Sequence, residues 1–432
     1  MFKKLTLENF KNFKKAELHL GPFTILVGAN ATGKSNIREA FRFLHGIGRG
    51  YTIPDIIGQK HTSGERVWSG IRGGIKELVY LSKSNIESTF SLSLLDSHET
   101  KDDLFWKEYS IEVSPGSPNK TPRVISEQLI SDRNVMFEAY IDPMGEVFMV
   151  RADPIEPYEF DIRWDVTKPV LLQMQSPLSH VKFLGYVVDF VENAKKEVAT
   201  TVNILSSMRF FEFNPEMMRI PSFPGQTTLG DQGENLSSVL HAICQDEQKK
   251  LILTEWLREL TPMDATDFIF TPDQIGRILV TIVEKDGHKT SAYSASDGTL
   301  RFLGILAAFL GPNRPKFYFL EELENGIHPT RLHLLTQFIE NQVAQGDIQV
   351  VATTHSPLLL NYLSQDSLKH ASLLYRLEGH PDAHIKPIMT IPDARELIKK
   401  QGIMRLYESG WFEDMLYLLD DTEAMPDTEV PV

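Results

Sequence analysis

The stretch that decides the fold is Gly28-Ala29-Asn30-Ala31-Thr32-Gly33-Lys34-Ser35, which fits the phosphate-binding loop pattern G-x-x-x-x-G-K-[ST]. The residues before it, Phe23–Val27, form a short apolar run that is typical of a buried strand. After the loop, apolar residues follow at the spacing of one helix face: Ile37, Ala40, Phe41 and Leu44. A strand, a glycine loop and a helix N-terminus in this order form a site for anions.

The residue types of this loop predict a nucleoside triphosphate as the ligand. Backbone N–H groups and the helix dipole point toward the phosphates, Lys34 neutralises the β/γ oxygens, and Ser35 offers its hydroxyl to Mg²⁺. The residues expected to contact the nucleotide are Asn30, Ala31, Thr32, Gly33, Lys34 and Ser35. The alternative is a chance match in an ordinary turn, which the flanking strand and helix disfavour.

Composition describes an ordinary globular chain. It has 432 residues, 42% hydrophobic and 24% charged, and no apolar run approaches the ~18 residues that a membrane span needs. The net charge of −14 argues against a protein that coats DNA, although a local basic groove stays possible. The single cysteine, Cys244, fits a reducing cytoplasm, and its apolar neighbours predict a packed thiol.

Changes of hydrophobic period predict four parts. They are a first lobe with the phosphate-binding loop (1–95), inserted strands with a helical arm (96–265), a second lobe (266–392), and a C-terminal helical segment with an acidic tail (393–432). From Asp267 onward, strands and helices alternate, which predicts a parallel sheet. The expected class is therefore α/β, a mixed sheet flanked by helices, with an inserted β and helical segment.

Smaller elements are predicted from local patterns. Alternating strands are expected at 77–81, 89–95, 109–113, 136–141 and 147–151, with a hairpin turn at 142–145. Long helical segments are expected at 181–205 and 235–260, and neither sustains the heptads of a coiled coil. Glycines at 46, 48 and 50 are expected to break the helix after the loop, and the tail at 422–432 is expected to be disordered.

Two strand ends carry the other groups that hydrolysis requires. The apolar run Phe317–Leu320 ends in Glu321 and Glu322, which predicts Glu321 as the carboxylate that holds Mg²⁺ and Glu322 as the one that polarises the attacking water. The alternative is a surface acidic cluster, which does not explain why the pair ends an apolar strand. A second apolar run ends in Thr353-Thr354-His355, so His355 is predicted to contact the γ-phosphate.

A third motif precedes these strands. Ser294-Ala295-Ser296-Asp297-Gly298-Thr299-Leu300-Arg301 leads into an apolar helix, so Ser296 and Gly298 are predicted to form a second anion site that has no lysine. Read alone, the motif is equally a helix cap.

The order of these motifs resembles the ABC-type ATPase heads of SMC and RecF-like proteins, within the AAA-family ATPases. More closely it resembles the bacterial phage-defence ATPases related to the overcoming-lysogenization-defect nucleases. The opening Asn9-Phe10-Lys11-Asn12-Phe13 is similar to that group's Asn-Phe-(Arg/Lys)-x-Phe, and the stretch from Glu322 to Pro329 is similar to its Glu-Pro-Glu-x-x-Leu-His-Pro. Gly233-Glu234-Asn235-Leu236 is similar to its Gly-x-Asn-Leu.

The resemblance implies a split ATPase head that works as a homodimer or higher even oligomer. ATP would lie between the loop of one subunit and Ser296–Gly298 of the other, with Lys11 as a further nucleotide contact. Leu323 replaces the usual proline, and Glu321 stands where many relatives carry aspartate. The regulatory glutamine is not identified; Gln59 is a candidate by type only, and a solvated loop residue is the favoured interpretation.

Two functions stay open at this point. The first is an ATP-driven conformational switch that controls a separately encoded nuclease or toxin in antiviral defence, with nucleic acid as a further possible partner. The second is a RecF-like ATPase that acts directly on DNA. No nuclease is expected within the chain, because too few residues follow His355 for an independent domain. The aromatic-rich segment 403–412 is expected to be core, or otherwise a partner surface.

Overall fold

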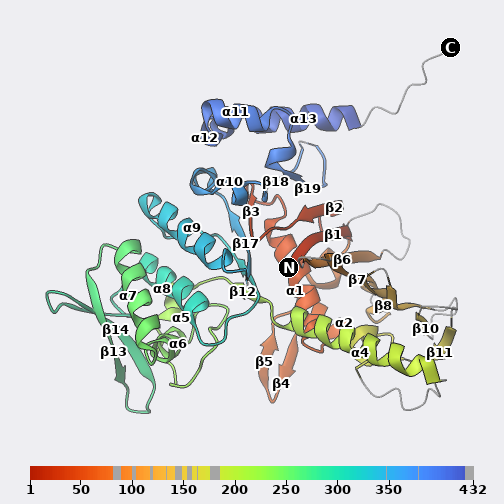
Figure 1. Ribbon diagram of the computed structural model, residues 1–432, viewed down its shortest axis with the longest axis horizontal. Helices are drawn as coiled ribbons and strands as arrows, with labels where there is room; N and C mark the ends of the chain where they lie inside the picture. The colour runs from red at the N-terminus through yellow and green to blue at the C-terminus, as the bar shows by residue number, and fades with distance from the viewer. Residues whose placement is uncertain are drawn as a thin grey trace. The chain divides into compact units, whose positions relative to one another are not determined.

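The computed structural model describes residues 1–80, 89–99, 104–116, 120–132, 134–141, 148–152, 158–162, 164–175, 185–346, 348–377 and 379–423. These residues form two compact units (Figure 1). The first unit comprises 1–21, 28–208 and 372–387, and the second comprises 22–27, 209–371 and 388–432. The predicted hairpin turn at 142–145 and the tail from 424 lie outside the described residues.

An antiparallel sheet of eight strands organises the first unit. Its order is β11-β10-β9-β8-β7-β6-β1-β2. The bounds are β1 Phe2–Phe10, β2 Phe13–His19, β6 Phe90–Glu99, β7 Leu104–Ser114, β8 Arg123–Ser131, β9 Asn134–Ile141, β10 Phe148–Ala152 and β11 Tyr158–Ile162. β6 therefore continues through residue 95, where the predicted first lobe ends, because it pairs with both β1 and β7. The four-part division stays a prediction.

One predicted strand of this unit is wrong, and several strands, β8 and β11 among them, were not predicted. The strand predicted at 77–81 does not form. Its first residue ends a short 3₁₀ helix, η1 (Gly74–Glu77), and Val79 makes only an isolated bridge with Phe10. β8 escaped prediction because a charged residue, Glu127, occupies one of its buried positions and interrupts the alternation of apolar and polar residues.

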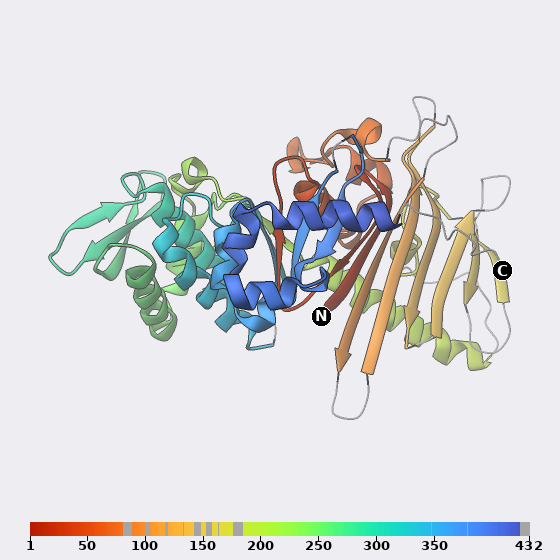
Figure 2. The same cartoon turned by 90° about the horizontal axis from the view of Figure 1, so that it is seen from above.

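Helices α1 (Lys34–Gly48) and α4 (Gly185–Ser206) pack against each other, and α4 runs along one face of the long strands (Figure 2). The prediction that Gly46 and Gly48 break the helix is wrong, because both lie inside α1. A Cβ on Gly48 would lie 2.4 Å from the backbone nitrogen of Ser206, so this glycine permits close packing of α1 and α4. The predicted helix at 181–205 is confirmed over residues 185–205, which lie in α4, and residues 181–184 lie outside the described residues.

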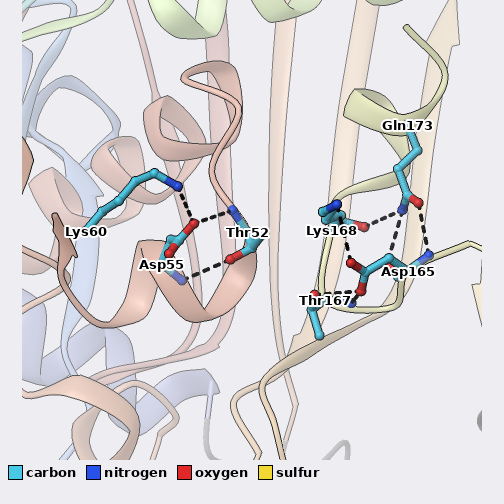
Figure 3. A network of polar contacts seen from close by, with 7 residues as sticks. All are labelled: Thr52, Asp55, Lys60, Asp165, Thr167, Lys168 and Gln173. Atoms are coloured by element: carbon cyan, nitrogen blue, oxygen red, sulfur yellow. Dashed lines mark hydrogen bonds and ion pairs between the residues drawn. The ribbon is translucent and has the colours of Figure 1, made fainter. Parts of the chain in front are cut away.

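Polar contacts hold two connections of the first unit (Figure 3). Thr52 caps α2 (Ile53–Ile57) in a capping box with Asp55, and Lys60 at the start of the hairpin β4 (Lys60–Thr62) and β5 (Glu65–Trp68) donates to the Asp55 carboxylate at 2.5 Å. Burial would raise the pKa of Asp55, but hydrogen bonds from Lys60 and Thr52 lower it below its usual range.

Asp165 stabilises the loop before α3 (Val170–Gln173), as Figure 3 shows. Its carboxylate accepts the Thr167 N–H, its own N–H donates to Gln173 Oε1, and its carbonyl accepts from Gln173 Nε2. The carbonyl of Thr167 accepts the backbone N–H of Ile53 at 2.8 Å, which joins this loop to the start of α2.

A parallel sheet forms the centre of the second unit, in the order β12-β16-β17-β3. The bounds are β12 Arg209–Phe211, β16 Phe317–Leu320, β17 Gln349–Thr354 and β3 Phe23–Val27. Helix α9 (Pro329–Val343) is the crossover between the parallel strands β16 and β17, and it packs with α7 (Glu247–Leu260) and α8 (Asp297–Leu310) in the arrangement of Figure 1. The predicted parallel pairing of the Glu-Glu strand with the His355 strand is confirmed.

Two predictions within this unit need correction. The segment expected as one helix at 235–260 is two helices, α6 (Leu236–Ile243) and α7, because Asp246 accepts the first N–H groups of α7 and starts a new helix. The alternation expected from Asp267 begins only later. β13 (Ala265–Pro272), β14 (Ile278–Glu284) and β15 (Lys289–Ser291) form a separate antiparallel sheet, because tight turns join them.

The chain after β17 is mainly helical and short in its elements. They are η2 (Pro357–Tyr362), α10 (Gln365–Leu368), β18 (Ala371–Tyr375), β19 (His384–Pro387), η3 (Ile388–Thr390), α11 (Ala394–Gln401), α12 (Ile403–Glu408) and α13 (Trp411–Glu423), with α5 (Pro215–Met218) earlier in the chain. Ile403, Leu406 and Phe412 are buried, which agrees with core for the segment 403–412. Among the described residues, no helix is both long and apolar enough to cross a membrane.

Candidate functional site

The phosphate-binding loop owes its shape to backbone conformations that few residues adopt. Ala31 has φ 64° and Gly33 has φ 107°, both in the left-handed region. A Cβ on Gly28 would lie 2.4 Å from the carbonyl oxygen of Leu374, so this position excludes any side chain. Ala29, Asn30 and Ala31 are exposed, and α1 begins directly after Gly33. The loop therefore presents backbone at a helix N-terminus, which suits an anion.

Lys34 lies over the loop from the first residue of α1. Only 7% of it is exposed, and its Nζ donates to the carbonyl oxygens of Gly28 at 2.5 Å and Ala29 at 2.7 Å. Thr32 Oγ1 donates to the Ala29 carbonyl at 2.9 Å. Ser35 follows in the first turn and is half-buried. A cation over a glycine cradle, with a hydroxyl one residue further, fits a phosphate group and its Mg²⁺.

The turn between β1 and β2 lies against this loop. The ideal Cβ position of Gly33 is 2.6 Å from Phe13 Cζ, and Asn36 Nδ2 in α1 donates to Asn12 Oδ1 at 2.6 Å. Asn12 is thus a site residue that the sequence reasoning did not assign, although it lies in the motif that carried the family resemblance. Its contact with α1 is visible only in the folded chain.

Lys11 contacts a different partner. Its Nζ donates to the carbonyl oxygen of Arg72 at 2.6 Å. Burial lowers the pKa of Lys11, while the carboxylates of Glu39 and Glu77 act in the opposite direction. The described contacts thus join Asn12 to the loop helix, whereas a role for Lys11 at the nucleotide stays a prediction. Gln59 is exposed in the connection between α2 and β4, as expected for a solvated loop residue.

The acidic strand end forms a tight turn in the second unit. Glu321 N–H donates to the carbonyl of Phe211 at 3.0 Å. Glu322 follows with φ 49°, a left-handed conformation that costs an ordinary residue about 1 kcal/mol or more. Its N–H donates to Thr353 Oγ1 at 3.0 Å, and this bond holds the strained residue against β17.

The side chain of Glu322 has two polar neighbours. Asn325 Nδ2 donates to Glu322 Oε2 at 3.0 Å, and His355 Nε2 lies 3.5 Å from Glu322 Oε1. Glu322 and His355 are 51% and 36% exposed in their side chains, so the pair can be reached from solvent. The structure therefore brings together the predicted water-polarising carboxylate and the predicted γ-phosphate contact.

The third sequence motif, residues 294–301, leads into α8 and forms its first turn. Ser296 is the N-cap, and its Oγ accepts the N–H of Thr299 at 3.1 Å, so the capping interpretation left open above is observed. A Cβ on Gly298 would lie 2.5 Å from the carbonyl of Gly326, which places the motif beside the turn that follows Glu322. Arg219 binds Asp297 Oδ1 at 2.7 Å and the Ala295 carbonyl at 3.0 Å.

The register of the parallel sheet places the ends of β16, β17 and β3 next to one another. Glu321 and Thr353 follow the paired residues Leu320 and Ala352, and Val27 of β3 lies opposite Thr354 of β17. Gly28 is the next residue after Val27, and His355 is the next after Thr354. The described residues contain no group of three or more His, Cys, Asp or Glu side chains arranged for a metal. Glu321 and Ser35 remain the predicted Mg²⁺ ligands.

Cys244 fits the predicted packed thiol, because burial raises its pKa to about 12. At that pKa the reactive thiolate is scarce near neutral pH.

Comparisons with known proteins agree with this architecture. Residues 1–55 match a family model described as an AAA ATPase domain, and residues 175–361 match one described as an AAA domain, putative AbiEii toxin, Type IV TA system. A protein of Helicobacter pylori named ATP/GTP phosphatase is 38% identical over 73 residues, which are 16% of this chain and 19% of that protein. The alignment thus spans about a fifth of that relative.

Among solved structures, an SMC head bound to the C-winged helix domain of ScpA superposes with a TM-score of 0.50 at 11% identity, covering 89% of this chain and 96% of that one. This similarity concerns the fold alone. The chain has the P-loop NTPase fold of the ABC type, as predicted, and the two AAA domain matches confirm the predicted enzyme class, an ATPase.

Proposed function

We propose that this chain hydrolyses ATP with a divided set of groups. Residues 28–35 bind the phosphates, Ser35 and Glu321 hold Mg²⁺, Glu322 positions and deprotonates the attacking water, and His355 contacts the γ-phosphate. Mg²⁺ would supply charge neutralisation at the phosphate oxygens. The observation that carries this proposal is the register of β16, β17 and β3, since three neighbouring strands end in Glu321-Glu322, in His355 and in the phosphate-binding loop.

We further propose that two copies close on ATP. Ser296–Gly298 begins a helix of fourteen residues, Asp297–Leu310, so its backbone N–H groups favour an anion. The motif contains no lysine, and the nucleotide of a second subunit supplies the phosphate that it lacks. The assembly is a homodimer or a higher even oligomer. Contacts across it exist only in the closed state, so ATP shifts the equilibrium between two shapes.

In this proposal, the ATP-dependent change of shape controls a separate effector protein, a nuclease or toxin, in antiviral defence. The family description that matches residues 175–361 names a putative toxin of a Type IV system, which supports a role in a two-component conflict system. The resemblance to overcoming-lysogenization-defect ATPases points the same way. A cytoplasmic location and an additional nucleic-acid partner are part of the proposal.

A RecF-like ATPase that acts on DNA itself is the second candidate, because the fold is that of SMC heads. Co-expression of the chain with the products of its neighbouring genes, followed by purification with and without ATP, distinguishes the two. We expect an effector to co-elute in a nucleotide-dependent manner, and the purified chain alone to leave DNA intact with Mg²⁺ and ATP. DNA cleavage by the chain alone would overturn the switch in favour of the second candidate.

A further inference from the structure

A half-buried carboxylate beside the hydrolytic pair has no role in the proposal so far. Glu324 Oε1 accepts two backbone N–H groups, from His355 at 2.7 Å and from Ser356 at 3.2 Å. Its other oxygen, Oε2, is buried and makes no hydrogen bond within the described part of the chain. A buried carboxylate oxygen without a partner costs free energy, so this residue calls for an explanation beyond stability.

The contacts of Glu324 complete a set of bonds between two strand ends. Leu323 N–H donates to the carbonyl of Thr353 at 3.0 Å, and Glu322 N–H donates to Thr353 Oγ1 at 3.0 Å. These bonds run from the turn after β16 to the last residues of β17. The bonds to Glu324 run in the reverse direction, from β17 to the turn. The backbone of His355 is thereby attached to the same four-residue turn that carries Glu322.

We infer that Glu324 is the positioning residue of the hydrolytic pair: by accepting the His355 and Ser356 N–H groups, it sets the distance between the His355 ring and the Glu322 carboxylate. The inference rests on the proposed roles of those two residues. An ionised acceptor strengthens both bonds, since charge-assisted hydrogen bonds are about twice as strong as neutral ones. Oε1 alone accepts both N–H groups, and Oε2 takes no part in this role.

The competing role for Glu324 is direct deprotonation of water, and a pair of substitutions separates the two. Glu324→Gln keeps an oxygen that can accept the two N–H groups but cannot act as a base. Glu324→Ala removes the acceptor as well. We expect Glu324→Ala to lower kcat by about 10–100-fold, in the range for supporting residues around an active site, with KM for ATP within about twofold. Glu324→Gln should retain kcat within about fivefold.

A matched control is Glu340, whose Oε1 likewise accepts backbone N–H, here from Ser364 at 2.8 Å, away from the strand ends. Glu340→Ala should lower the thermal midpoint comparably while leaving kcat within about twofold. Thr353→Val, which removes the acceptor for Glu322 N–H with little change of volume, provides a second positioning variant if Glu324→Ala fails to fold. It should lower kcat with unchanged KM.

A double-mutant cycle between Glu324 and His355 distinguishes a positioning role from a purely structural one. In the background of His355→Ala, the substitution Glu324→Ala should lower kcat by less than about twofold further, because its effect passes through His355. Full additivity would overturn the inference, as would an unchanged kcat in Glu324→Ala. Loss in Glu324→Gln as deep as in Glu324→Ala would assign direct base chemistry instead. A normal rate in Glu322→Gln would overturn the proposed function, and that result is separate from these.

Discussion

The phosphate-binding loop and the Glu322 turn are both short turns after buried parallel strands, yet they are built from different material. The loop is made of backbone: left-handed φ at Ala31 and Gly33, a position at Gly28 with no room for a side chain, and carbonyls that hold Lys34. The Glu322 turn is made of side chains that reach between neighbouring strands. Asn325, Thr353 and Glu324 each contact it or hold its partner His355.

Because the two turns are built differently, they also form under different conditions. A backbone site is specified by its own eight residues, because glycine and lysine at fixed spacing suffice. A side-chain site requires two strands in the correct register, and its residues come from segments about thirty positions apart in sequence. We therefore expect substitutions in the loop to affect binding and substitutions around the turn to affect turnover.

The largest effect on ATP hydrolysis should come from replacing the central charged residue of each turn, which is Lys34 in the loop and Glu322 in the other. Glu322→Gln should keep ATP binding and lower turnover by about 10²–10⁴-fold, the range for removal of a general base. Lys34→Ala should lose binding instead. Equilibrium binding of a fluorescent ATP analogue and steady-state phosphate release measure both, with the exposed helix residue Glu255→Gln as a control. Hydrolysis at the wild-type rate by Glu322→Gln would refute the assignment.

An intermediate effect is expected from mixing subunits. Lys34→Ala chains and Ser296→Arg chains should each be inactive, and mixed dimers should recover one composite site and part of the wild-type activity. The control mixes Lys34→Ala with chains that carry both substitutions, which leaves no intact loop. If mixed dimers form and no activity returns, the proposal that ATP binds between two subunits is wrong.

The smallest effect concerns a third carboxylate, which is held by backbone but lies far from solvent. Glu127 is buried in β8 and accepts Val170 N–H at 2.6 Å, Leu171 N–H at 2.8 Å and Tyr109 Oη at 2.9 Å. Burial raises the pKa of Glu127 to about 7, against the opposing effect of these hydrogen bonds. The folded state therefore binds this proton more tightly than the unfolded state does.

The sign of the pH dependence follows. Between the ordinary glutamate pKa and about 7, the free energy of unfolding should fall as pH rises, by about 1.4 kcal/mol per unit of pKa shift. The stability difference between wild type and Glu127→Gln, from denaturant melts at pH 5 to 8, should accordingly shrink as pH rises. Glu138→Gln, on neighbouring β9, controls for loss of a carboxylate. A difference that widens with pH would show that the folded state favours the ionised form.

Local patterns predicted the parts whose chemistry is local. The loop at 28–35 follows a recognised spacing of glycine and lysine. The apolar strands that end at Val27, Leu320 and Thr354 were predictable because each is a short apolar run with polar residues at its end. Predictions failed where a distant neighbour decides the conformation. Gly46 and Gly48 continue a helix because Ile56 and the end of α4 pack against them.

The sequence by itself therefore determined that the chain carries a phosphate-binding loop and two polar strand ends in an α/β fold, since motif and period are properties of contiguous residues. Tertiary structure alone decided that the Glu322 and His355 side chains approach to 3.5 Å, that Glu324 holds the His355 backbone, and that Asn12 contacts α1. It also decided that β8 is a strand in spite of Glu127, whose buried carboxyl group accepts N–H groups from residues more than forty positions away. A hydrogen bond between distant segments has no signature in either segment, because each partner has the same residue type with or without it.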